Sequence, residues 1–157
     1  FSAANAAAFD AGLLYLGRFG SSGIHWSLGA KVSNIGSKIK YDKESYALPS
    51  TARLGGSVSI PISTYEVLSC AVDADYQLQP AEARNLGLSA GVEYSMLKRV
   101  FLRAGYRLGD KEKGDGRSAT FGLGAAVKWF RAELAYLAAG KDKPLRNTWY
   151  IPVGAAF

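Results

Sequence analysis

The chain has 157 residues, of which 48% are hydrophobic and 20% are charged, and its formal net charge is +6. No run approaches the roughly 18 to 20 consecutive apolar residues that a membrane-spanning helix needs. The single cysteine, Cys70, excludes an intramolecular disulfide framework, and we interpret it as a small apolar residue. The positive charges form no continuous stripe, and we therefore expect no nucleic-acid partner.

Nine segments show the alternation of apolar and polar residues that is typical of a two-faced β-strand. In chain order they span residues 8–18, 23–33, 51–60, 67–78, 86–95, 99–108, 118–129, 131–138 and 149–157. In the clearest of them, Ile24, Trp26 and Leu28 alternate with His25 and Ser27. One phase is almost free of charge throughout, and the clean runs have the roughly 9–11 residues that a tilted strand needs to cross a bilayer. The fold class that we predict is all-β.

The last segment ends on an aromatic residue, Phe157, which is in phase with Trp149, Ile151 and Val153. Such an end resembles the closing strand and assembly signal of bacterial outer-membrane β-barrels. In water it would be an exposed apolar edge, whereas in a closed barrel the strand is paired and surrounded by acyl chains.

The connections between the segments alternate in length. Short turns are expected at 19–22, 61–64, 95–98 and 129–131, and longer connections at 34–49, 79–85, 109–117 and 139–147. Outer-membrane barrels have short periplasmic turns and longer external loops. With the carboxy terminus in the periplasm every long connection becomes external, so strand phase and connection length both predict an antiparallel transmembrane β-barrel.

A soluble β-sandwich also shows alternating strands separated by turns. Here, however, the polar phase is rich in Gly and Ser, and aromatic residues gather near strand ends in the apolar phase. The residues expected to form interface girdles are Tyr76, Tyr94, Tyr106, Trp129 and Trp149. We therefore prefer the barrel.

Several pieces of the chain, in this order, resemble the PorV/PorQ family of outer-membrane proteins. They include a strand that ends at Val32–Asn34, a turn at Ile35–Gly36, the loop Lys38–Tyr41 and the strand Arg103–Arg107. The resemblance covers about residues 8–138 and implies a FadL-like fold of fourteen strands. It makes residues 1–157 a single domain, the C-terminal portion of an outer-membrane β-barrel with about five strands missing upstream. The alternative is an eight-stranded barrel closed by residues 23–157.

The resemblance also implies a non-enzymatic role in type IX secretion, at the outer membrane of a Gram-negative (diderm) bacterium. PorV-like members receive secreted cargo and shuttle it to a cell-surface attachment complex, and PorQ-like members work in that attachment machinery. The expected partners are outer-membrane lipid and lipopolysaccharide, proteins of the secretion translocon or attachment complex, and secreted cargo, with no cofactor. The alternative function is a FadL-like channel for hydrophobic small molecules.

Two groups of residues are candidate sites. The partner-docking loop, which would otherwise be a hydrated surface, consists of Lys38, Ile39, Lys40, Tyr41, Tyr46 and Leu48, because loops carry binding on rigid barrels. The lumen charge network consists of Asp73, Asp75, Glu93, Arg99, Arg103 and Arg107 on three successive strands. Its acids and bases are expected to pair across strands, either as a structural network or as a charged passage for a polar or anionic ligand.

An enzymatic function has little support in the residues. His25, the only histidine, lies on the same strand face as Ser27 at roughly 6–7 Å, which is too far for a direct hydrogen bond. No set of nucleophile, base and orienting group is present, and carboxylates without His or Cys form no obvious metal site. We therefore expect no catalytic residues, no metal ligands and no enzymatic activity, and a membrane hydrolase using His25 is the weakest alternative.

Overall fold

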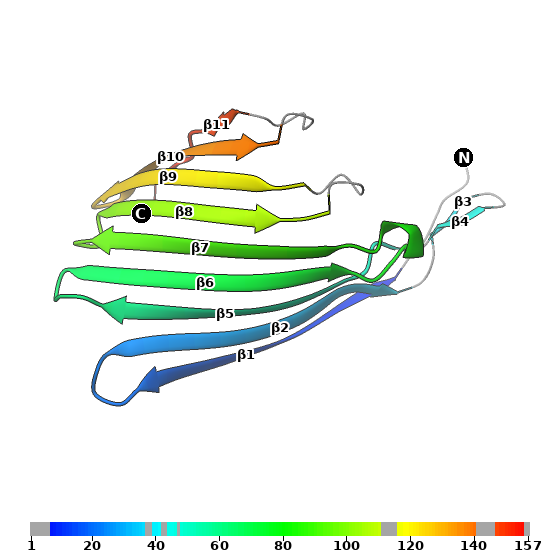
Figure 1. Ribbon diagram of the computed structural model, residues 1–157, viewed down its shortest axis with the longest axis horizontal. Coiled ribbons are helices and arrows are strands. Elements are labelled where there is room, and N and C mark those ends of the chain that lie inside the picture. Colours follow the sequence, from blue (N-terminus) through cyan, green and yellow to red (C-terminus); the bar gives the residue numbers. More distant parts are fainter. Residues whose placement is uncertain are drawn as a thin grey trace.

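The computed structural model describes residues 7–36, 39–41, 44–46, 48–110, 116–140 and 147–155. In these parts the chain is all-β and antiparallel, as predicted, and the short 3₁₀ turn η1 (Ala81–Ala83) is the one helical element (Figure 1). Within the same residues, no helix has the length and hydropathy needed to cross a membrane.

Eight long strands form the body of one sheet, and each pairs in antiparallel register with the next long strand in the chain. They are β1 (Ala8–Phe19), β2 (Ile24–Gly36), β5 (Thr51–Pro61), β6 (Glu66–Gln77), β7 (Leu86–Met96), β8 (Val100–Leu108), β9 (Ser118–Val127) and β10 (Phe130–Ala139). These bounds follow the alternating segments of the sequence closely, because the alternation places apolar side chains on a single face of the sheet.

The short strands β11 (Thr148–Tyr150) and β12 (Val153–Ala155) together form the predicted terminal strand. Tyr150 pairs with Ala135 and Val153 pairs with Ala132 on β10, so the register continues across the gap. Between them, the Glu133 N–H donates to the Pro152 carbonyl at 2.9 Å. Proline has no N–H for the ladder, which explains why the strand is interrupted there. Residue 157 lies outside the described residues.

The predicted alternation of connection lengths is confirmed. The connections after β1, β5, β7 and β9 are short and lie at one end of the strands, the border of the sheet that we call the turn edge (Figure 1). Those after β2, β6, β8 and β10 are longer and lie at the opposite edge, the loop edge. The strands therefore form a meander in which all the long connections lie at the loop edge.

The connection predicted at 34–49 is more regular than expected. β2 extends to Gly36 in place of the predicted turn at Ile35–Gly36, and β3 (Ile39–Tyr41) pairs with β4 (Glu44–Tyr46) in a separate two-stranded sheet. The register between β1 and β2 shifts between Phe9 and Ala11. Asn34 lies at this irregularity with φ of 57°, and its N–H donates to Asp10 Oδ1 at 2.9 Å. The signal at Asn34 therefore marks a β-bulge rather than the end of the strand.

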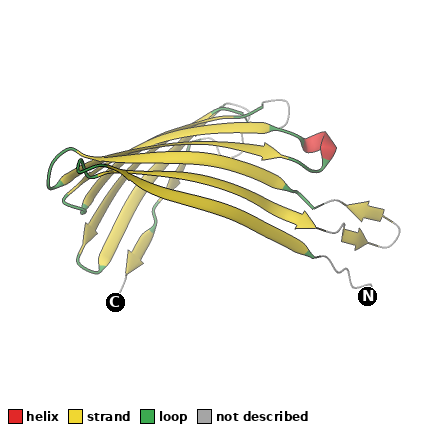
Figure 2. Ribbon diagram, turned by 90° about the horizontal axis from the view of Figure 1, so that it is seen from below, coloured by secondary structure: helices red, strands yellow, loops and turns green. Residues whose placement is uncertain are grey.

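The sheet is a single curved layer whose two outermost strands do not pair with each other (Figure 2). Because β2 pairs with both β1 and β5, the alternative of an eight-stranded barrel closed by residues 23–157 is wrong for this structure. No second sheet packs over the first in the described residues, so the β-sandwich is not observed either. None of the described hydrophobic side chains is buried.

Candidate functional site

The strand register pairs polar residues with polar residues and apolar residues with apolar residues on neighbouring strands. The sheet therefore has a polar face and an apolar face. On the polar face, Ser69 of β6 pairs with Ser59 of β5 and with Glu93 of β7, and Glu93 pairs with Arg103 of β8. The charged residues of the described strands on this face are Asp10, Arg18, Lys31, Arg53, Asp73, Asp75, Glu93, Arg103, Arg107, Arg131 and Glu133.

One part of the predicted charge network is centred on Arg107. Its Nη1 donates to Asp75 Oδ1 at 2.7 Å, and its Nη2 donates to Asp75 Oδ2 at 3.1 Å. Nη1 also lies 3.1 Å from Ser89 Oγ, and Arg53 approaches the same carboxylate from the other side, with Nη2 at 3.9 Å from Asp75 Oδ1. Arg107 reaches Asp75 across Gly87, where an added Cβ would lie 2.8 Å from both Asp75 oxygens. The glycine therefore leaves the path that this bidentate pair needs.

A second cluster is centred on Arg103. Its Nε donates to Glu93 Oε2, and its Nη1 donates to Glu133 Oε2 at 2.6 Å. Glu133 also accepts from Arg131 Nε at 2.5 Å. The Phe101 ring lies beneath both arginines, with its centroid 5.6 Å from Arg103 Cζ and 4.9 Å from Arg131 Cζ. The two acids and two bases thus neutralise one another around an aromatic platform.

The sequence did not identify Arg53, Arg131, Glu133 and Phe101 as members of these clusters. Each of these residues alternates with apolar residues in its strand, so the sequence places it on the polar face. Which of them contact one another depends on the pairing of the strands, which the sequence pattern does not give. Arg99, in contrast, was predicted to belong to the charge network but lies in the turn before β8 and not on a strand. Its backbone closes the turn, with N–H donating to the Met96 carbonyl at 2.9 Å, and it makes no ion pair with a described residue.

Asp73 differs from the other predicted carboxylates. It pairs in register with Gly55 and Ser89, and its Oδ1 is enclosed and has no hydrogen-bond partner. Neither Arg53 nor Arg107 comes within ion-pair distance of it. Asp73 is therefore on the predicted face but outside the predicted network.

His25 and Ser27 have different neighbours in the structure. His25 pairs in register with Ser59 on β5 and Arg18 on β1, while Ser27 Oγ hydrogen-bonds Ser57 Oγ at 2.7 Å. Within the described residues, no group of three His, Cys, Asp or Glu side chains is arranged to hold a metal ion. Ser59 Oγ likewise hydrogen-bonds Ser69 Oγ at 2.8 Å, and these two serine pairs connect neighbouring strands in the uncharged part of the polar face.

The residues of the predicted docking loop lie at the loop edge. Ile39, Lys40 and Tyr41 form β3, Tyr46 ends β4, and residue 38 lies outside the described residues. Leu48 is half-buried just before β5, and its carbonyl lies 3.4 Å from Ser50 Oγ. The predicted set is therefore spread over a hairpin and the segment that leads back into the sheet.

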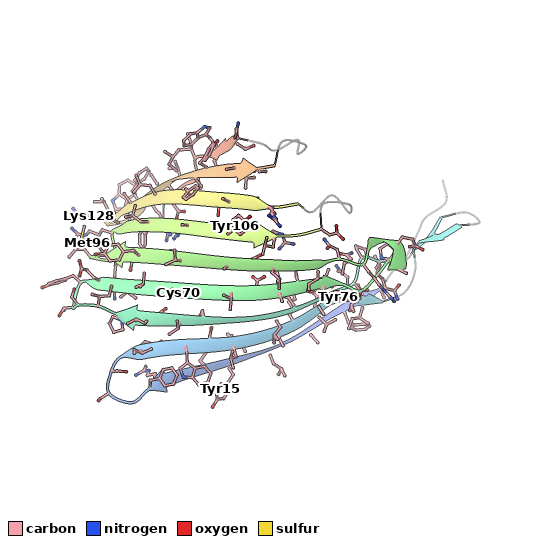
Figure 3. The ribbon with its side chains drawn as sticks, viewed as in Figure 1. Tyr15, Cys70, Tyr76, Met96, Tyr106 and Lys128 are labelled. Carbon is pink, nitrogen blue, oxygen red and sulfur yellow. The ribbon has the colours of Figure 1, made fainter. Side chains whose placement is uncertain are left out.

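The apolar face is nearly free of charge. Within the described strands of the large sheet, Glu66 at the start of β6 is its one charged residue, and it accepts a hydrogen bond from Tyr94 Oη at 2.6 Å. Large side chains on this face are open, with Leu13 exposed to 83% and Val72 to 63%. Cys70 is exposed among them, and Figure 3 places it between the two edges of the sheet.

Aromatic residues mark both ends of the apolar face. Of the predicted girdle residues, Tyr76 and Tyr106 lie toward the loop edge (Figure 3). By its place at the start of the terminal strand Trp149 lies toward the same edge, and Tyr94 near the end of β7 and Trp129 between β9 and β10 lie toward the turn edge. The structure adds partners that the sequence pattern did not reveal. The Tyr15 and Trp26 centroids are 5.3 Å apart, those of Phe19 and Trp26 are 6.0 Å apart, and those of Tyr136 and Trp149 are 4.7 Å apart.

Fold and site define a protein built on one two-faced antiparallel sheet, apolar on one side and carrying paired charges on the other. No family model and no curated protein matches the chain. What the geometry of the described residues offers chemically is binding surface: cross-strand ion pairs, hydroxyl pairs and the Asp73 carboxylate, whose enclosed Oδ1 has no hydrogen-bond partner.

Proposed function

We propose that this chain is part of an outer-membrane β-barrel and a non-enzymatic component of protein secretion or cell-surface attachment of the PorV/PorQ type. The observation that carries the proposal is the apolar face. Its exposed large hydrophobic side chains extend over every long strand, whereas soluble monomers rarely expose contiguous apolar patches above roughly a few hundred Å². Lipid acyl chains would cover this face without any further protein layer.

The direction of the outer strands supports a larger barrel. The nine strand positions from β1 to β11 are joined by antiparallel steps only, so β1 and the terminal strand run in the same direction. Direct closure would pair them in parallel. An odd number of further strands would close the sheet with antiparallel pairs throughout, and the five that the family resemblance implies meet this condition. A second copy of the chain in the same membrane orientation would place its β1 parallel to the terminal strand of the first copy, so it does not meet this condition.

The external loops would be the docking surface. The β3–β4 hairpin extends beyond the loop edge (Figure 1), and its register places Ile39 opposite Tyr46 and Tyr41 opposite Glu44. In a barrel with the short turns in the periplasm, this hairpin faces the cell exterior. A rigid sheet that presents aromatic and charged residues on a projecting hairpin is suited to binding protein partners.

A second candidate function is a channel for hydrophobic small molecules, and it is favoured by β1. Leu14 and Leu16 lie in the polar-face phase of that strand, opposite Gly29 and Ser27, and each is exposed to 69%. They give that part of the polar face an apolar character. The two charge clusters on the neighbouring strands favour the docking role, because desolvated charges oppose the passage of apolar molecules.

The test is a crosslinking pull-down of the full-length protein from native outer membranes, with partners identified by mass spectrometry. The double variant Tyr41→Ala/Tyr46→Ala is expected to reduce the recovery of secreted cargo and leave solute uptake unchanged. Tyr65→Ala is the matched control, since Tyr65 is an exposed tyrosine at the turn edge. Impaired uptake with unchanged cargo recovery would favour the channel, and recovery of porins and lipopolysaccharide alone would contradict the docking role.

A further inference from the structure

Three short connections at the turn edge lie side by side and are joined through the backbone. They are the β5–β6 turn at 62–65, the β7–β8 turn at 97–99 and the β9–β10 turn at 128–129. The Leu97 N–H donates to the Tyr65 carbonyl at 2.6 Å. On the other side of the same turn, the Ala126 N–H donates to the Arg99 carbonyl at 2.6 Å. The side chains of the three turns are therefore presented from one continuous stretch of the turn edge.

Two of these turns hold side chains in a backbone conformation that disfavours them. In the described residues φ is positive at five residues other than glycine, and the two outside these turns are both asparagine, which tolerates this region. The other three are Leu97 with φ of 56°, Lys98 with 55° and Lys128 with 52°. Asparagine or glycine is the usual choice for positive φ in a two-residue hairpin turn. The fold alone therefore does not explain why leucine and lysine stand here, and strain of this kind is often found at functional positions.

The same stretch of the turn edge is basic. In the described segments 61–66, 96–99 and 127–131 the charged residues are Glu66, Lys98, Arg99, Lys128 and Arg131. Arg131 is paired with Glu133 at 2.5 Å, and Glu66 already accepts a hydrogen bond from Tyr94 at 2.6 Å. The remaining three bases are exposed and make no ion pair with a described residue. Because neighbouring strands lie roughly 4.8 Å apart, the long basic side chains of adjacent turns can reach one anionic group together.

Apolar side chains accompany these bases. Tyr65, Leu97 and Trp129 come from the same three turns, and each is more exposed than buried. They extend the apolar face of the sheet to the tips of the turns. Aromatic and aliphatic side chains mixed with lysine and arginine are typical of surfaces at the boundary between acyl chains and headgroups. An acidic protein surface would complement the bases alone, whereas an anionic lipid complements the bases and the apolar side chains together.

We propose that Lys98, Arg99 and Lys128 bind the headgroups of anionic phospholipids in the leaflet at the turn edge, which is the periplasmic leaflet of the proposed barrel. Leu97 and Trp129 lie among the adjoining acyl chains. Anionic phospholipids are favoured over zwitterionic ones because their phosphate has no compensating ammonium in the same headgroup. The inference rests on the proposed function, since it requires lipid on the apolar face, and it deepens that function by naming the lipid class.

The test compares two spin-labelled lipids around the full-length protein in phosphatidylcholine vesicles. Electron paramagnetic resonance measures the fraction of labelled phosphatidylglycerol, or of labelled phosphatidylcholine, whose motion the protein restricts. The native protein is expected to favour phosphatidylglycerol about threefold. Lys98→Gln/Lys128→Gln is expected to lose at least half of that preference. Lys31→Gln/Arg117→Gln is the matched control, because it removes two positive charges nearer the loop edge, and it is expected to keep the preference.

Lys98→Gly separates lipid binding from a role in the turn itself. Glycine adopts positive φ freely, so this variant is expected to unfold at no lower urea concentration than the native protein. Its preference for phosphatidylglycerol is nevertheless expected to fall, because the ammonium group is gone. A destabilised Lys98→Gly variant that keeps the full preference would assign the lysine to the turn and overturn the proposal.

The outcomes distinguish this inference from the proposed function. If lipid does not cover the apolar face, the protein restricts neither label and both proposals fail. Equal restriction of the two labels by the native protein would overturn this inference alone and favour an acidic protein as the partner of the bases. An unchanged preference in Lys98→Gln/Lys128→Gln, or an equal loss in the control variant, would overturn it as well.

Discussion

The two faces of the sheet share one backbone but are built for different surroundings. On β6, Cys70, Val72 and Ala74 face one side, while Ser69 and Asp73 face the other. Among the residues that the structure describes, the apolar face has no ion pairs and no protein layer covers it. The polar face neutralises most of its charges within clusters. The difference indicates that each face is adapted to its own medium, lipid on one side and water on the other in the proposed barrel.

Glycine has a different use on the two faces. On the polar face, Gly87 and Gly105 leave room for side chains that lie flat across neighbouring strands, namely Arg107 and Thr120. On the apolar face, the Trp26 ring lies over Gly17, where an added Cβ would clash with it. The same residue type therefore makes room for polar contacts on one face and for aromatic packing on the other.

The largest expected effect comes from placing a charge on the apolar face. Val72→Arg should destabilise the membrane-embedded protein by about 2–4 kcal/mol, because Val72 lies near the middle of its strand and would face the bilayer centre. Ala71→Arg, on the next residue and the opposite face, should cost less than about 1 kcal/mol. Urea titrations in lipid vesicles, read by the gel mobility of folded and unfolded protein, measure both. Equal effects of the two variants would contradict the assignment of the faces.

A smaller effect is expected from breaking the Arg103 cluster. Arg103→Met leaves the carboxylates of Glu93 and Glu133 with fewer partners and should cost about 1–3 kcal/mol, reduced by the partial exposure of all three side chains. Arg99→Met, in the turn, should change the free energy of unfolding by less than about 0.5 kcal/mol. In a double-mutant cycle, Glu93→Gln should cost less in the Arg103→Met background than alone. Additive costs would show that the pair is not coupled.

The smallest effect concerns the glycine under the Arg107 pair. Gly87→Ala should destabilise by about 1 kcal/mol, because the new methyl group displaces Arg107 and Asp75 from each other. Gly91→Ala is the matched control on the same strand, since its methyl group makes only an ordinary contact, and it should be nearly neutral. The midpoints of the urea transitions compare the two. A Gly91→Ala variant as unstable as Gly87→Ala would point to strand propensity and not to the ion pair.

The strands could be predicted because their information is local. Alternation along each segment fixes which residues share a face, and the spacing of polar turns fixes the meander, so the predicted bounds lie close to the observed ones. Local irregularities of the strands, which depend on the hydrogen bonds of single residues, are harder to predict from the sequence. The Pro152 interruption and the bulge at Asn34 depend on which backbone groups face a partner strand, and alternation does not encode this.

The candidate charge network was only partly predictable for a related reason. Sequence phase places Asp73 and Asp75 on one face but cannot say which of them Arg107 reaches. That choice depends on the register between strands and on the gap at Gly87. Glu133 joins Arg103 although the two residues lie on strands separated by β9. Long side chains crossing a glycine position are a three-dimensional feature that residue spacing does not reveal.

The central claim, that lipid covers the apolar face, is tested most directly at Cys70. It is the only cysteine in the chain, and it is exposed on the apolar face of β6. A nitroxide label attached there in the full-length protein, reconstituted in vesicles, should collide more often with oxygen, which concentrates in the bilayer, than with a water-soluble nickel chelate. More frequent collision with the chelate would place this face in water and contradict the account.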